Sequence, residues 1–252
     1  MWFKRKTLID QLLDHRNQDL FDYVSKSLSL SVERTTAPYY GLYTQGTKAI
    51  VYVPYGEPSP SSFAHELLHA ELKIRGVNFS TKLSVLERPA LIPIFSDALS
   101  DHITNVLEHR KMFPRFLSLG YNEDEFLSDS RIAILTKPVV DSLIHGLKQG
   151  IDYSADGINN YIGKYLAARA SCFSFFNYDE ELQQLRDVEP GLSSVLEGLV
   201  DRWDKYDIEN EGDPLYDSYL MISFDFLNEV ESWVGSVINP TTNSLWSANI
   251  KS

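Results

Sequence analysis

The segment Phe63–Leu72 is an apolar, helix-forming stretch that contains the pattern His-Glu-x-x-His, with His65, Glu66 and His69 as its fixed members. Residues four apart in an α-helix lie on the same face, about one turn from each other. Both imidazoles can therefore reach one metal ion, and Glu66 can hold a water on that ion. The pattern predicts a metal-binding helix to which the rest of the chain adds scaffold, a third ligand and a substrate cleft.

The residues on either side of this segment favour helix boundaries. Ser59-Pro60-Ser61-Ser62 offers capping hydroxyls and a proline suited to a first turn, and Gly76 after Lys73-Ile74-Arg75 is a typical helix stop. We therefore expect the motif in the middle of a helix, where the spacing of four works. A structural helix with two partnered core histidines is the alternative explanation of the same pattern.

Composition indicates a folded protein without extracellular features. Residues are 43% hydrophobic and 12% aromatic, and only 23% are charged, which supplies a packed core and argues against global disorder. The single cysteine, Cys172, excludes an internal disulfide framework and fits a reducing compartment. No secretion signal follows the basic start, and no apolar run reaches the roughly 18 residues of a membrane span. We expect a cytoplasmic protein with no membrane association.

The net charge of −12 is concentrated in the C-terminal part of the chain. Residues 151–252 carry 18 of the 35 acidic side chains but only 6 of the 23 basic ones, so residues 1–150 are neutral overall. This balance argues against nucleic-acid binding through the C-terminal part. Such an excess usually forms a solvated face. The alternative is a docking surface for a basic protein partner.

Hydrophobic periodicity predicts an α+β fold that is mostly helical. The expected elements are amphipathic helices within residues 6–30, an antiparallel hairpin from Tyr39–Tyr43 and Ala49–Pro54, the motif helix, a helix over Pro93–Phe116, and helical stretches near 139–147, 157–177, 178–204 and 214–238. A break near Asp152–Gly157 divides residues 1–150, which hold the motif, from residues 151–252. The second part is expected to be an acidic helical region that packs on the first or extends it.

The order of helix, hairpin, loop and motif helix over residues 35–115 resembles the zincin metallopeptidases, with the His-Glu-x-x-His segment as its specific part. The resemblance implies a small sheet above the motif helix, with a substrate strand pairing at the sheet edge. It also implies one Zn²⁺ held by His65, His69 and a third protein ligand from a helix downstream.

Two adjacent residues compete as the third ligand. The segment Asn105–His109 resembles the ligand helix of the gluzincin subgroup, whose third ligand is a glutamate, and this favours Glu108. Helical phase favours His109, which borders the apolar stripe of its predicted helix, whereas Glu108 falls on the polar face. A catalytic cleft is also wet, so the phase does not exclude Glu108. Both residues stay open, with His102 or Asp101 as a further alternative.

These residues together predict a zinc metallopeptidase acting on a peptide or protein substrate. The metal lowers the pKa of a bound water, and Glu66 acts as general base and then delivers the proton to the leaving amine. Two alternatives belong to other classes. One is a non-catalytic or regulatory metal-binding module that docks a partner through its acidic C-terminal region. The other is a helical interaction protein in which the motif is a coincidence.

Overall fold

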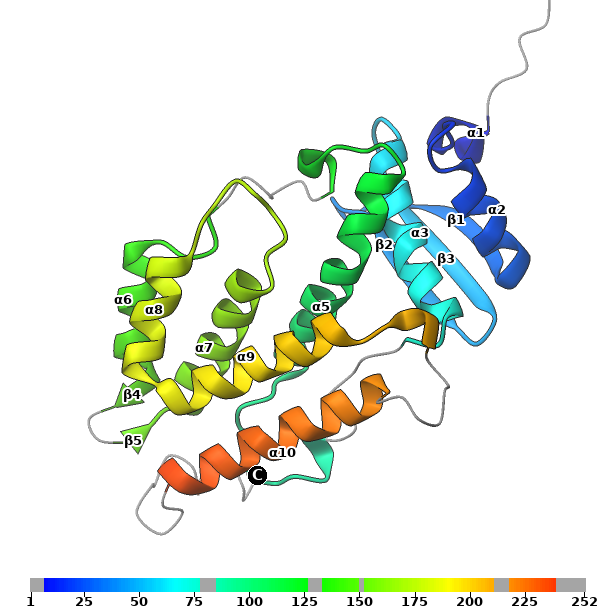
Figure 1. Ribbon diagram of the computed structural model, residues 1–252. Coiled ribbons are helices and arrows are strands. Elements are labelled where there is room, and N and C mark those ends of the chain that lie inside the picture. The colour runs from blue at the N-terminus through cyan, green and yellow to red at the C-terminus, as the bar shows by residue number, and fades with distance from the viewer. Residues whose placement is uncertain (1–6, 78–84, 127–132, 150–151, 211–217, 239–252) are drawn as a thin grey trace, which may run out of the picture. The chain divides into compact units, whose positions relative to one another are not determined.

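The fold is mixed α+β with helices predominating, as the sequence predicted. The computed structural model (Figure 1) describes residues 7–77, 85–126, 133–149, 152–210 and 218–238. The chain forms two compact units, Met1–Asn78 with Lys111–Arg131, and Phe79–Arg110 with Ile132–Ser252. One continuous helix, α5 (Asp97–Ser118), contributes its first part to the second unit and its last part to the first unit.

The first unit contains a three-stranded sheet with the order β1-β3-β2. Its strands are β1 (Ser29–Thr35), β2 (Gly41–Gln45) and β3 (Lys48–Pro54). β2 and β3 form the predicted antiparallel hairpin, in which Leu42 lies opposite Val51. β1 pairs with the other edge of β3 in parallel, and Val32 lies opposite the same Val51. The sheet is therefore mixed.

The parallel strand corrects the sequence prediction, which expected helices throughout residues 6–30 and a purely antiparallel sheet. Two helices do precede the strand, α1 (Leu8–Leu12) and α2 (Gln18–Ser27). The chain then becomes extended because Leu30 and Val32 alternate with polar residues, the period of a half-buried strand. That alternation is too short to compete with the longer helical stripe before it, so the sequence alone did not reveal it.

One face of the sheet packs against α2 and the motif helix α3 (Pro60–Ile74), as Figure 1 shows. Ala49, Val51 and Val53 alternate along the central strand and are fully buried, so they supply the core on that face. The predicted boundaries of α3 are confirmed. The Ser62 N–H donates to the Ser59 hydroxyl at 3.1 Å, and Gly76 after the helix adopts a positive φ of 83°.

A buried asparagine holds the first turn of α3 in place. Asn17 is fully buried, and its side-chain amide donates to the carbonyl oxygens of Leu12 at 2.9 Å and Pro60 at 3.1 Å. The Tyr121 hydroxyl also donates to the Pro60 carbonyl, at 3.3 Å. Buried polar groups with partners specify one arrangement, because a shift would leave them unpaired. The connection between α1 and α2, which contains Asn17, and the segment after α5, which contains Tyr121, thus both fix where the motif helix begins.

The described residues of the second unit form helices and one short two-stranded pairing. Its elements after α5 are α6 (Lys137–Leu147), β4 (Lys148–Gln149), β5 (Asp152–Tyr153), α7 (Ala155–Arg169), α8 (Asp179–Val188), α9 (Pro190–Lys205), the short η2 (Ile208–Asn210) and α10 (Tyr219–Val237). α9 packs against α7, α8 and α10 (Figure 1). The fully buried Tyr161 joins three of these helices, because its hydroxyl lies 2.8 Å from both the Leu185 carbonyl and the Ser193 hydroxyl. Across the described ranges, no helix combines the length and the apolar character needed to cross a membrane.

Candidate metal centre

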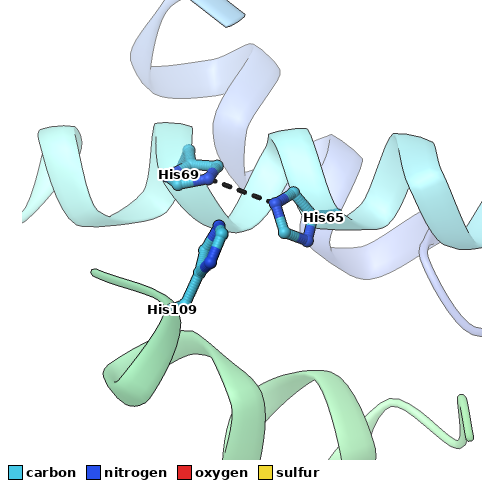
Figure 2. Close-up of side chains that lie close together, drawn as sticks. All are labelled: His65, His69 and His109. Carbon is cyan, nitrogen blue, oxygen red and sulfur yellow. Dashed lines mark hydrogen bonds between the residues drawn. The ribbon is translucent and has the colours of Figure 1, made fainter. Parts of the chain in front are cut away.

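Helix α3 brings His65 and His69 together, as the spacing of four predicted. Their Nε2 atoms lie 3.2 Å apart, and Figure 2 shows the two rings pointing toward each other from successive turns. Two nitrogens bound to one tetrahedral zinc, each about 2.0–2.1 Å from the metal, are themselves separated by about 3.3 Å. The spacing of this pair therefore fits two ligands of a single zinc ion.

His109 on α5 completes a three-imidazole cluster. One ring nitrogen from each of His65, His69 and His109 lies within 4.8 Å of the other two. Figure 2 shows the His109 ring directed at the pair on α3. Three neutral imidazoles with a free fourth position form a common donor set for catalytic zinc. The donor set therefore fits the predicted metal.

The part of α5 that follows His109 packs beside α3 within the first unit. Phe113 and Phe116 pack edge-on against Phe126, with ring centroids 5.3 and 5.0 Å away. Arg115 pairs with the buried Glu71 of α3 at 3.8 Å, and Glu71 also binds Arg75. Aromatic packing and a partly buried ion pair thus fix the end of α5.

Phe126 is a site residue that sequence reasoning missed. Its ring packs against the His65 imidazole in a tilted arrangement, with centroids 4.7 Å apart. This contact restrains the orientation of the imidazole beside His69. Phe126 follows the acidic turn η1 (Glu123–Glu125), far from the motif in the chain, and only the packing of that turn reveals its role.

The three motif residues differ in exposure. His65 and Glu66 are each 7% exposed, whereas His69 is only partly buried. Burial, followed by the nearby His69, lowers the pKa of His65 to about 3, so its imidazole is neutral as metal binding requires. Burial raises the pKa of the Glu66 carboxyl, which His69 partly offsets. A carboxyl with a raised pKa is better suited to take up and release a proton near neutral pH.

The other candidate ligands lie outside the cluster. Glu108 precedes His109 on α5 and is 3% exposed, and among the described residues the group that can hold a metal contains His109 and not Glu108. One helical step separates their directions by about 100°. His102 instead bonds the Gly163 carbonyl through Nε2 at 3.1 Å. Neither Asp101 nor His102 belongs to the cluster.

We expect the metal-free protein to lose stability as the pH falls below about 6.5. In the unfolded chain His65 binds a proton below about 6.5, whereas in the folded protein its pKa is about 3. Between these values the unfolded state holds the extra proton, so the free energy of unfolding falls by about 1.4 kcal/mol per pH unit toward acid. Above pH 6.5 His65 is neutral in both the folded and the unfolded state, so its titration no longer lowers the stability.

Urea unfolding in the presence of a chelator, at several pH values from 7 to 4, measures this dependence. The matched variant is His65→Gln, which is polar and does not titrate in this range. The free energy of unfolding of this variant should fall less steeply with decreasing pH than that of the wild type. The difference in slope should correspond to about one bound proton. Parallel curves for the two proteins would show that His65 is not the group responsible.

Comparison of the chain with known proteins finds no relative: no family model matches, and neither the curated proteins nor the solved structures give a significant match. The function must therefore be inferred from this chain's own residues. These include a cluster of three histidines, two on α3 and one on α5, and a buried glutamate of the same motif.

Proposed function

We propose that this protein is a zinc-dependent metallopeptidase of the zincin type. The observation that carries the proposal is the approach of three imidazole nitrogens within 4.8 Å of one another, two of them from a His-Glu-x-x-His helix. The donor number and type match a catalytic zinc site that keeps one position for water or substrate.

The residues of the site have separate tasks in this mechanism. His65, His69 and His109 hold the ion through neutral imidazoles, with Phe126 orienting His65. Bound zinc supplies a lowered pKa for its water and polarises the carbonyl of the substrate. Glu66 accepts a proton as the water attacks the peptide carbonyl, and it then donates that proton to the departing amine. Burial favours the protonated form of Glu66 and thus eases the first transfer.

The first unit supports a peptide substrate over a small molecule. β2 is an edge strand, and α3 packs against both β2 and β3. An edge strand presents unpaired backbone N–H and C=O groups with which an extended peptide can pair. This arrangement is consistent with a zincin core within residues 1–150.

Metal analysis of protein purified without added zinc tests the proposal first. We expect about one zinc per chain, and hydrolysis of an unfolded protein such as casein that stops on treatment with 1,10-phenanthroline and returns with zinc. Zinc without hydrolysis of any peptide offered would favour a non-catalytic metal-binding module. Absence of stoichiometric metal would leave the motif as part of a helical interaction protein.

A further inference from the structure

Two residues of α9 form hydrogen bonds with α5, one before and one after His109. The indole N–H of Trp203 donates to the Leu107 carbonyl at 2.7 Å, and Trp203 is fully buried. The next residue, Asp204, accepts two hydrogen bonds from the Arg110 guanidinium, at 2.5 and 2.6 Å. Leu107 and Arg110 lie two residues before and one residue after His109. The turn of α5 that carries the third imidazole is thus bonded at both ends to one turn of α9.

A proline inside α5 removes one backbone hydrogen bond close to His109. Pro114 lies inside α5 and has no N–H, so the carbonyl of Arg110 loses its helical hydrogen-bond donor. The proline ring also crowds that carbonyl, which loosens or kinks a helix at this point. The helix therefore has one backbone hydrogen bond fewer directly after His109. The contacts from α9 to Leu107 and Arg110 supply additional bonds in this region.

Asp204 has a second effect, on charge. Arg110 follows His109 in the chain, and an unpaired positive charge near the site would oppose the binding of a divalent cation. The two-pronged contact with Asp204 pairs that charge. The carbonyl of Ala170 accepts a further bond from Arg110 at 3.4 Å, so the guanidinium is directed away from its own helix. Geometry and charge at His109 thus depend on the same residue of α9.

We propose that Trp203 and Asp204 are positioning residues for the metal site, which act through Leu107 and Arg110 to hold His109 in its ligand direction. The proposal rests on the proposed function, because it takes His109 as a zinc ligand. It extends the site to α9, a helix that contributes no ligand. Partners that orient a ligand typically change metal affinity by about 10- to 100-fold when they are removed.

The test is the zinc dissociation constant of Asp204→Asn, measured by competition with a chromogenic chelator. We expect about a tenfold rise, at the lower end of that range because Asp204 acts through a neighbour of the ligand. Asp201→Asn is the matched control. Asp201 lies on the same helix, is exposed, and pairs with Arg169 at 2.8 Å. It acts on Arg110 through its charge. This control should stay within about twofold of the wild type.

A double-mutant cycle separates positioning from general destabilisation. In a His109→Ala background, Asp204→Asn should leave the zinc dissociation constant unchanged, because no third imidazole is left to orient. The proposal would be overturned if Asp204→Asn changed the zinc dissociation constant equally in the wild-type and His109→Ala backgrounds. It would also be overturned if Asp204→Asn bound zinc as tightly as the Asp201→Asn control. Trp203→Phe, which keeps an aromatic ring and removes the donor, should reproduce the rise and its dependence on His109.

The outcomes also distinguish this proposal from the one on which it rests. A wild-type protein that binds no zinc overturns both. A wild-type protein that binds zinc and hydrolyses peptides, with an Asp204→Asn variant of unchanged affinity, overturns the positioning role alone. Far-ultraviolet circular dichroism of each variant checks that the helices are retained, and the half-exposed setting of the Asp204 pair predicts that they are.

Discussion

Replacement of Glu66 by glutamine is expected to abolish hydrolysis while zinc stays bound. Glutamine keeps the size and the hydrogen-bonding shape of the side chain but cannot take up a proton. General base catalysis contributes about 10²- to 10⁴-fold to a rate, so kcat should fall by that factor. The three imidazoles are untouched, and metal content should remain at the wild-type level. Steady-state hydrolysis of a fluorogenic peptide and metal analysis of the same preparation give both values.

Glu71→Gln is the matched control for this substitution. Glu71 lies on the same helix and, like Glu66, is 7% exposed, but its carboxylate pairs with Arg75 and Arg115 instead of facing the histidines. Its loss should lower stability modestly and leave kcat within a few-fold of the wild type. Full activity in Glu66→Gln, or an equal loss in both variants, would contradict the role of Glu66 as general base.

Replacement of one of the three proposed zinc ligands by alanine is expected to have the largest effect on metal binding. Structural zinc sites bind with about 10–16 kcal/mol, so each of three or four ligands contributes about 3 kcal/mol, or roughly a hundredfold in affinity. His65→Ala, His69→Ala and His109→Ala should each weaken zinc binding by at least that factor. Equilibrium dialysis against a buffered zinc series measures the change directly.

Glu108→Gln serves as the control at the third position, because Glu108 was the alternative ligand. Glu108 is buried beside His109 on α5, so glutamine keeps the packing and removes only the charge. We expect its zinc affinity to stay near that of the wild type, since Glu108 lies outside the histidine cluster. A sharp loss in Glu108→Gln with none in His109→Ala would reverse the ligand assignment. Loss in neither would remove α5 from the site.

Most of what could be predicted from the sequence depends on neighbours in the chain. The serine cap and the glycine stop around α3 are local signals, and both are found where they were expected. The β2–β3 hairpin is local as well, because its strands are joined by a two-residue connection containing Gly46. β1 was missed because a parallel strand owes its pairing to β3, which lies beyond another strand in the chain.

The candidate site divides in the same way. The pairing of His65 with His69 follows from the pitch of an α-helix, so the sequence by itself determined that two imidazoles would converge beside Glu66. Helical phase favoured His109 and the resemblance to the gluzincins favoured Glu108. Neither decided between them, because phase states which face a residue occupies and not what that face meets. Only the tertiary structure brought His109 into the cluster, packed Phe126 against His65 and placed Trp203 and Asp204 around the turn that carries His109. Those contacts join residues far apart in the chain, and they arise from packing that no local pattern encodes.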